Sequence, residues 1–424
     1  MIKKIIVSAV LFVLSITTGK AEDPNVLVTT SLYSGNYFKA LTLYNQYENE
    51  LTEMNKWMAQ ALLYSYFNKP TEGNVAINLL LEKYGIKLGT ASYFALSTLL
   101  ADNYAILQNY PQAEQALRNI TDKNLSTISP AIIAELQDQI AQYAALSYYA
   151  PLQVEMPEQD CTIRLTTTAS TSINVPVTVN GSEQVFIFDT GAAKCAISEQ
   201  MAKAVNAQII CDSVVVSGFG GQALGKLALI KELKLGDIRI TNIPFVVIPE
   251  EGNTAEHVNG VIGLSVISRL HEVQFALQDK KLVIPSQASS YPYTNNFFIK
   301  KGSLFVSCMN DSNPLIMFFD TGFNNFFLNE NYFSNNQAQV MQAGKKMLLE
   351  TSGVAGEVSD IAYELPSFSI TIGNRSTTLR SVNVLTQQDD LSISPNDGSI
   401  GLSAINQYKK VCVNFDMNAI SVYP

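Results

Sequence analysis

The chain has 424 residues, of which 47% are hydrophobic, and a formal net charge of −9. This length predicts two or three domains with well-packed cores. An acidic balance argues against nucleic-acid binding, which needs basic surface to displace phosphate counterions. Only two histidines are present, so a Ser-His triad and a multi-histidine metal site are very unlikely. We expect no metal, no cofactor and no nucleic-acid partner.

The first 21 residues have the pattern of an export signal. A basic start is followed by an apolar run at residues 5–16, which is too short to span a bilayer comfortably. Gly19-Lys20-Ala21 then suits signal-peptidase cleavage before Glu22. An uncleaved anchor is the alternative. We expect a mature protein that begins at Glu22, has no membrane span and is periplasmic or secreted.

Residues 22–150 differ in pattern from the rest, with Tyr, Leu and Ala at helical intervals and little Gly or Pro. Ala40, Ala76 and Ala113 recur at nearly equal spacing (76 − 40 = 36; 113 − 76 = 37). The region resembles tetratricopeptide-type (TPR-like) helical hairpins, which implies a short α-solenoid. Solenoid faces commonly bind peptides or proteins, so a protein partner here is a hypothesis. A helical bundle that merely packs against the remaining domains is the alternative.

Residues 151–160 are acidic and unpatterned, with prolines at 151 and 157, and are predicted to be a linker. After Cys161 the apolar residues alternate as in β-strands. Residues 175–179 and 184–188 flank Asn180-Gly181, which predicts a hairpin with a tight turn.

One short sequence motif occurs twice in the remaining sequence. An apolar strand leads into Asp189-Thr190-Gly191 and again into Asp320-Thr321-Gly322, at an offset of 320 − 189 = 131. Residues 262–265 likewise match residues 400–403, at an offset of 400 − 262 = 138. An internal repeat of this length predicts two copies of one β unit.

This duplicated pattern resembles the retropepsin-like (clan AA) aspartic proteases, with two copies fused in one polypeptide. The resemblance implies two homologous β-barrel lobes, residues 161–290 and 291–424, related by pseudo-twofold symmetry. The predicted fold class is therefore multidomain α + all-β, an N-terminal α-helical repeat region followed by the two lobes. Because both aspartates are in one chain, we expect a monomer to suffice for catalysis.

The resemblance also implies the site. Asp189 and Asp320 would be a catalytic pair that shares one proton and activates water against a peptide bond of a peptide or protein substrate. Thr190 and Thr321 would brace the two turns by reciprocal hydrogen bonds. Gly191 and Gly322 would permit the tight turns. Candidate flap glycines, on hairpins that would close over a substrate, are Gly218, Gly220, Gly221, Gly353 and Gly356.

Two alternatives and two expectations accompany this hypothesis. Phe323 follows the second turn where the family prefers a small or hydroxyl residue, so an inactive peptide- or partner-binding protein that keeps the fold is the rival. The helical region could instead be a prosegment, removed by cleavage between about Ala150 and Cys161. Five cysteines leave at least one unpaired within the chain. Among them Cys195 is expected to be a small buried residue, not a catalytic thiol.

Overall fold

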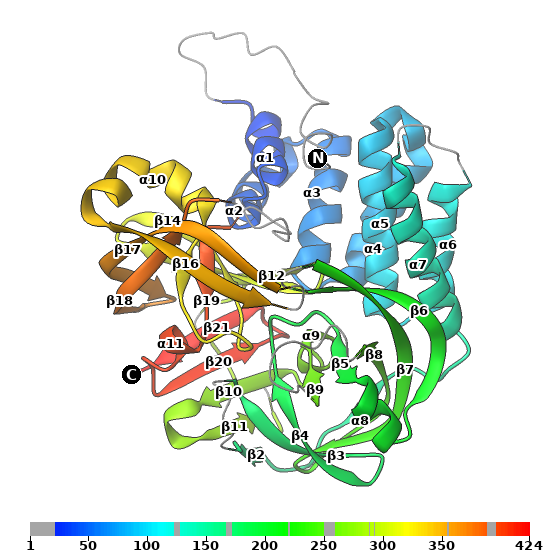
Figure 1. Ribbon diagram of the computed structural model, residues 1–424. Coiled ribbons are helices and arrows are strands. Elements are labelled where there is room, and N and C mark those ends of the chain that lie inside the picture. The colour runs from blue at the N-terminus through cyan, green and yellow to red at the C-terminus, as the bar shows by residue number, and fades with distance from the viewer. Residues whose placement is uncertain are drawn as a thin grey trace. The chain divides into compact units, whose positions relative to one another are not determined.

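The computed structural model describes residues 22–122, 128–166, 172–218, 221–249, 259–287, 289–291, 293–353, 356–387 and 396–424 (Figure 1). The predicted signal peptide, residues 1–21, lies outside them. The chain divides into two compact units, Met1–Ala144 and Ala145–Pro424, which are described separately. At the coarse level the architecture is N-terminal helices followed by β-sheets, as the sequence predicts.

The described part of the first unit is helical. Its α-helices are α1 Pro24–Tyr33, α2 Tyr37–Tyr47, α3 Glu53–Tyr66, α4 Pro70–Lys83, α5 Thr90–Ile106, α6 Tyr110–Thr121 and α7 Pro130–Leu146, which ends just inside the second unit. Helices adjacent in sequence pack on each other, as Figure 1 shows for α3 to α6. The three periodic alanines, Ala40, Ala76 and Ala113, are all buried, so their spacing reflects sites where helices approach closely.

One large sheet is formed by residues 153–262. Its strands are β1 Gln153–Glu155, β3 Asn174–Val179, β4 Ser182–Phe188, β5 Cys195–Ser198, β6 Gln208–Gly218, β7 Gly221–Leu235, β8 Ile238–Ile248 and β9 Gly260–Ile262. They lie in the order β1-β8-β5-β9-β4-β3-β7-β6. The predicted β3–β4 hairpin is confirmed: Asn180 and Gly181 have φ of +48° and +85°, the positive values that a two-residue hairpin turn requires.

A second large sheet is formed by residues 297–400. Its strands are β12 Phe297–Lys300, β13 Ser303–Asn310, β14 Asn313–Phe319, β15 Phe327–Leu328, β16 Lys345–Gly353, β17 Gly356–Ile372, β18 Arg375–Leu385 and β19 Gly398–Ile400. The order is β12-β13-β14-β19-β15-β18-β17-β16. Pairings in the first sheet recur here: β4 runs parallel to β9 as β14 does to β19, and β5 parallel to β8 as β15 does to β18.

Short helices accompany these sheets at matching places. α8 Glu199–Ala204 follows β5, and α10 Glu330–Ala343 follows β15. α9 Leu264–Ile267 follows β9, and α11 Leu402–Ile405 follows β19. The glycine before each of the last two helices, Gly263 or Gly401, is pressed against backbone carbonyls, because a Cβ at either position would collide with them.

A third sheet combines strands from both halves of the second unit, which the sequence did not indicate. It contains β2 Cys161–Arg164, β11 Lys281–Ile284, β10 Glu272–Ala276, β20 Lys410–Asn414 and β21 Ala419–Tyr423, in that order. The central pair, β10 and β20, is antiparallel. Fully buried Glu272 accepts a hydrogen bond of 3.1 Å from Asn414 across this pair. The expected boundary at residue 290 therefore separates two stretches of sequence that share this sheet.

The expected linker differs from the structure in part. Residues 153–155 form β1, which pairs antiparallel with β8, and Glu155 forms an ion pair of 2.7 Å with Arg239. A three-residue edge strand is held mainly by backbone hydrogen bonds, so its side chains carry almost no periodic signal. The first compact unit ends at Ala144, whereas we expected the helical region to extend to residue 150.

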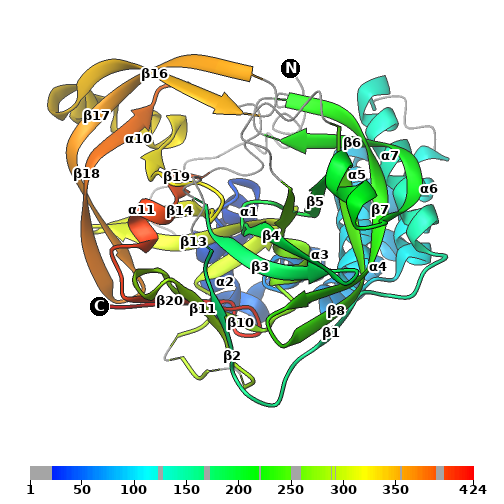
Figure 2. The same ribbon diagram turned by 60° about the horizontal axis from the view of Figure 1, so that its bottom comes forward.

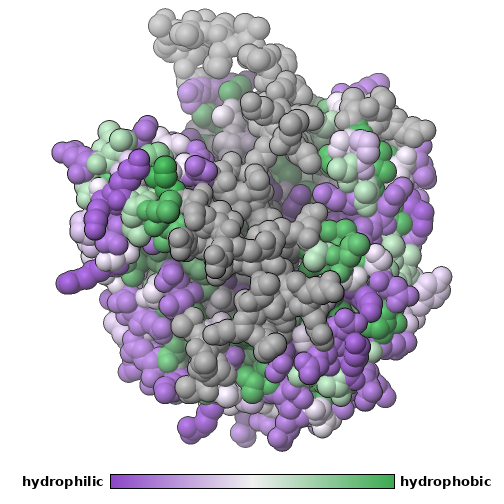
Figure 3. Space-filling view, in the orientation of Figure 1, coloured by the Kyte–Doolittle hydropathy of each residue, from purple (hydrophilic) through white to green (hydrophobic). Residues whose placement is uncertain are grey.

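Among the described residues, no helix combines the length and the apolar character needed to cross a membrane. On the face drawn in Figure 3, hydrophobic residues are scattered among hydrophilic ones and form no single broad patch.

Candidate active site

The two Asp-Thr-Gly turns sit at equivalent places in the two large sheets. Asp189 directly follows β4, and its backbone N–H donates to the carbonyl of Ile262 on β9 at 3.0 Å. Asp320 directly follows β14, and its N–H donates to Ile400 on β19 at 3.0 Å. A parallel neighbour strand thus fixes the end of each Asp-bearing strand. These neighbouring strands end at Ile262 and Ile400, the first residues of the repeated segments 262–265 and 400–403.

The fold brings the two carboxyl groups together. A Cβ added at Gly191 would collide with the carboxyl of Asp320, and a Cβ at Gly322 would collide with that of Asp189. Each carboxyl therefore lies against the glycine of the other turn, a closeness that only glycine permits. The backbone N–H of Gly191 donates to Asp189 Oδ1 at 2.7 Å, and that of Gly322 donates to Asp320 Oδ1 at 2.9 Å.

The two threonines form the reciprocal hydrogen bonds that the resemblance implies. Thr190 N–H donates to Thr321 Oγ1 at 2.9 Å, and Thr321 N–H donates to Thr190 Oγ1 at 3.1 Å. The Thr190 hydroxyl donates to the carbonyl of Phe319 at 3.0 Å, and the Thr321 hydroxyl donates to the carbonyl of Phe188 at 3.0 Å. Each of these carbonyls belongs to the residue before the opposite aspartate. Both threonines are fully buried, so water cannot replace these bonds. Four hydrogen bonds therefore lock the backbones of the two turns.

Thr190→Val should destabilise the protein because it removes one hydroxyl and leaves the Thr321 N–H and the Phe319 carbonyl buried without a partner. Each unpaired buried group costs about 1–3 kcal/mol. Thr190→Ser, which keeps the hydroxyl, should retain most of the stability. Denaturant unfolding of the three proteins measures this difference. A valine variant as stable as the parent would show that the bonds contribute nothing.

Both carboxyl groups are partly exposed but closely surrounded by protein, and this sets their protonation. Burial raises the pKa of Asp189, although hydrogen bonds from Gly191 and Asp320 oppose the rise. Burial raises the pKa of Asp320 well above its usual range, and the neighbouring charge of Asp189 raises it further. Two adjacent carboxylates cannot both ionise cheaply, so the pair retains a proton above the pH at which a free aspartate loses its own.

The raised pKa predicts a stability trend with pH. A carboxyl whose pKa is raised on folding contributes stability that is complete below its unfolded pKa, near 3.9, and is lost as the pH rises through the folded value. Asp320→Asn removes the repulsion between the carboxylates, so it should gain stability relative to the parent between about pH 3 and pH 7. Unfolding in denaturant at several pH values measures this. If the stability of the parent instead increased relative to that of the variant as the pH rises, the result would contradict the raised pKa.

The candidate flap glycines lie at the ends of two long hairpins. Gly218 pairs with Gly221 at the end of β6–β7, and Gly353 pairs with Gly356 at the end of β16–β17. Gly220 lies outside the described residues. In Figures 1 and 2 the described ends of the two hairpins approach each other.

Each of these hairpins also carries an exposed leucine that pairs with another apolar residue. Leu224, 70% exposed, lies opposite Val215 on β6–β7. Leu348, 62% exposed, lies opposite Ile361 on β16–β17. The sequence pattern did not indicate these residues, because apolar residues adjoin one another there, as at 214–216 and 347–349, and do not alternate. Apolar side chains at such positions are suited to covering a bound chain.

The remaining residues of interest have structural surroundings. The Phe323 ring packs edge-on against Phe327 at a centroid distance of 5.6 Å. Cys195 is fully buried, and burial raises the pKa of its thiol to about 11, so it behaves as the small buried residue that we predicted. All five cysteines are free thiols. Within the described residues, no group of three or more His, Cys, Asp or Glu side chains could hold a metal ion.

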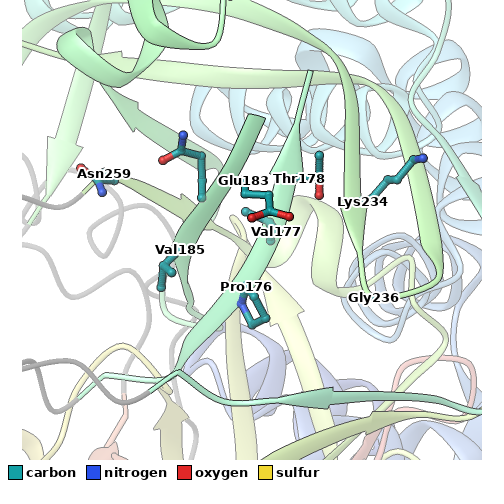
Figure 4. A pocket seen from close by; sticks show the side chains of 9 residues that line it. Pro176, Val177, Thr178, Glu183, Val185, Lys234, Gly236 and Asn259 are labelled. Carbon is teal, nitrogen blue, oxygen red and sulfur yellow. The ribbon is translucent and has the colours of Figure 1, made fainter. Parts of the chain in front are cut away.

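One open pocket of about 630 Å³ lies elsewhere, along β3 and β4 (Figure 4). Its lining includes Thr178, Glu183 and Lys234 but no residue of either Asp-Thr-Gly turn. We therefore do not associate it with the paired carboxyl groups.

A buried residue next to both Asp-bearing strands was also not predicted from the sequence. Phe275 on β10 packs its ring against Phe188 at 6.1 Å and against Phe319 at 6.3 Å. These are the residues directly before the two aspartates. The shared sheet thus supports both Asp-bearing strands through one buried ring. No local pattern marks Phe275, because its role depends on contacts distant in sequence.

Comparison with known proteins bears on the first of the two turns. No curated protein is significantly similar to the chain in sequence. Residues 175–266, which contain Asp189 but not Asp320, match the family model described as aspartyl protease. At a coarse level, the match supports a protease-type hydrolase domain over these residues.

Proposed function

We propose that this protein is an exported aspartic endopeptidase in which Asp189 and Asp320 form one dyad that activates water. The observation that carries the proposal is the pairing of the two aspartates, each against the glycine of the opposite turn. The four threonine hydrogen bonds support it, since they would hold the pair rigidly. The aspartyl protease match around Asp189 agrees with it.

The proposed chemistry follows from the shared proton. The ionised member of the dyad accepts a proton from a bound water, and the protonated member donates to the oxygen of the scissile carbonyl. Water attack then gives a tetrahedral diol. The dyad returns a proton to the leaving nitrogen, and the C–N bond breaks. Because the titration belongs to the pair, neither aspartate is the permanent acid or the permanent base.

We further propose that the two large sheets are homologous retropepsin-like lobes related by pseudo-twofold symmetry. The recurrence of strand pairings supports this relation. The β6–β7 and β16–β17 hairpins would be the flaps. Their exposed leucines would cover an extended peptide bound between the lobes largely through backbone hydrogen bonds. Since both aspartates are in one chain, a monomer would be sufficient.

Two parts of the proposal concern the rest of the chain. Export to the periplasm or the exterior rests on the pattern of residues 1–21. The helices of the first unit would form TPR-like hairpins, an idea supported by the burial of Ala40, Ala76 and Ala113. Their surface would bind a protein partner or part of the substrate.

The catalytic prediction uses a mixture of synthetic peptides from about pH 3 to pH 7. The mature protein should produce internal cleavages, identified by mass spectrometry. Asp189→Asn and Asp320→Asn should each lose at least about 100-fold in rate, the usual minimum contribution of general acid–base catalysis. Asp311→Asn, on an exposed turn of the same half, is the matched control and should stay active.

Two results would count against the proposal. Substantial activity in either dyad variant would exclude a two-carboxylate mechanism. No cleavage by folded parent protein at any pH, with peptide binding retained, would favour the inactive peptide-binding alternative. Phe323 beside the second turn would then be the first residue to replace.

A further inference from the structure

The face of the second large sheet that carries Asp320 is lined by aromatic rings. Side chains two apart on a strand share a face, so Phe318 lies on the same face as Asp320. Phe318 pairs with Phe305 on β13, which pairs with Phe298 on β12. The rings are in contact, with centroid distances of 5.8 Å and 5.2 Å respectively. A continuous aromatic row thus crosses three strands beside the second turn.

Lys300 lies on this same face, at the end of β12. It follows Phe298 by two residues and pairs with Ser303. The β13–β14 pairing ends at Phe305 and Phe318, and Ser303 and Asp320 each lie two residues beyond this last pair. Lys300 and Asp320 therefore lie at the same end of these three strands, where two strand spacings correspond to about 10 Å.

The hairpin that carries Lys300 is also held against the first turn. Its tip contains Gly302, whose φ of +73° suits the tight connection between β12 and β13. A Cβ at residue 302 would collide with Ala193, which follows Asp189 by four residues (193 − 189 = 4). The tip therefore packs beside the loop that leaves the first aspartate. Lys300, two residues before Gly302, therefore lies near the loop that follows Asp189.

The surroundings of Lys300 favour interaction with an anion. Its side chain is partly buried, and burial together with the charge of Lys301 lowers its pKa to about 8, which still leaves it mostly protonated at neutral or acidic pH. Lys301 adjoins the tip, and Lys194 adjoins Ala193, so three cationic residues lie around this contact. A partly desolvated ammonium interacts with an opposite charge more strongly than one in bulk water.

We propose that Lys300 forms a cationic subsite that selects an acidic side chain of the substrate. The inference rests on the proposed peptidase function, because it concerns the peptide held at the Asp189–Asp320 pair. An extended peptide advances about 3.3 Å per residue, so 10 Å corresponds to about three residues. The acidic side chain lies within about three residues of the scissile bond.

The experiment uses two mixtures of synthetic peptides that are identical except that every Glu and Asp in one is Gln or Asn in the other. Parent protein, Lys300→Met and Lys300→Glu are incubated with each mixture, and cleavage sites are identified by mass spectrometry. Lys203→Met, on α8, is the control. Retention of the same peptides on immobilised Asp189→Asn protein, with and without Lys300→Met, provides a readout that does not require cleavage.

The parent and the Lys203 control should prefer acidic peptides at one position near the cleaved bond by about tenfold, which corresponds to about 1.4 kcal/mol. Lys300→Met should lose this preference while still cleaving neutral peptides, and Lys300→Glu should reverse it. An unchanged preference in Lys300→Met, or none in the parent, overturns the subsite and leaves the peptidase intact. Lys300-dependent retention without cleavage overturns the peptidase and supports the subsite. Neither cleavage nor retention overturns both.

Discussion

The hydrogen bonds between Thr190 and Thr321 are the constraint on which the site depends. Two adjacent carboxyl groups repel each other as soon as both ionise, so some other interaction must hold them together. Each threonine supplies a backbone donor and a hydroxyl to the opposite turn, and both are buried. The bonds join backbone to side chain across the two halves, so neither turn can move without breaking them. The fold thereby retains the burial that raises the pKa of both carboxyl groups and the neighbouring charge that raises the pKa of Asp320 further.

The sheets also hold the two aspartates in position. β9 and β19 fix the ends of the Asp-bearing strands, and Phe275 of the shared sheet packs against the residue before each aspartate. Gly302 adds another contact between the two halves, because the β12–β13 tip of one half packs on Ala193 of the other. The site is thus held by rigid strands and a buried ring, while the β6–β7 and β16–β17 hairpins extend beyond this support. Rigid strands around the two aspartates and long hairpins next to them would suit the proposed peptidase, which must bind a peptide and then cover it.

Much of this could be predicted from the sequence wherever the signal was local. Asn180-Gly181 specified its hairpin because few residues adopt the positive φ of that turn. The repeated Asp-Thr-Gly phrases predicted matching turns, and the structure brings these turns together. The shared sheet, β1, Phe275 and the position of Lys300 were not predicted. They depend on pairings such as that of Glu272 with Asn414, which join residues far apart in sequence and leave no periodic pattern. The glycines at the two hairpin ends were visible in the sequence as flap candidates, but the apolar residues paired nearby required the strand register.

The central claim is that the two turns act as one chemical unit. A double-mutant cycle tests it most directly, by comparing kcat/KM for Asp189→Asn, Asp320→Asn and the variant carrying both changes. If the carboxyl groups share one proton and one task, either substitution removes the whole function, and the double variant should be no slower than the slower single variant. Losses that multiply, so that the double variant shows the product of the two single effects, would mean that the aspartates act independently. That result would contradict the shared dyad.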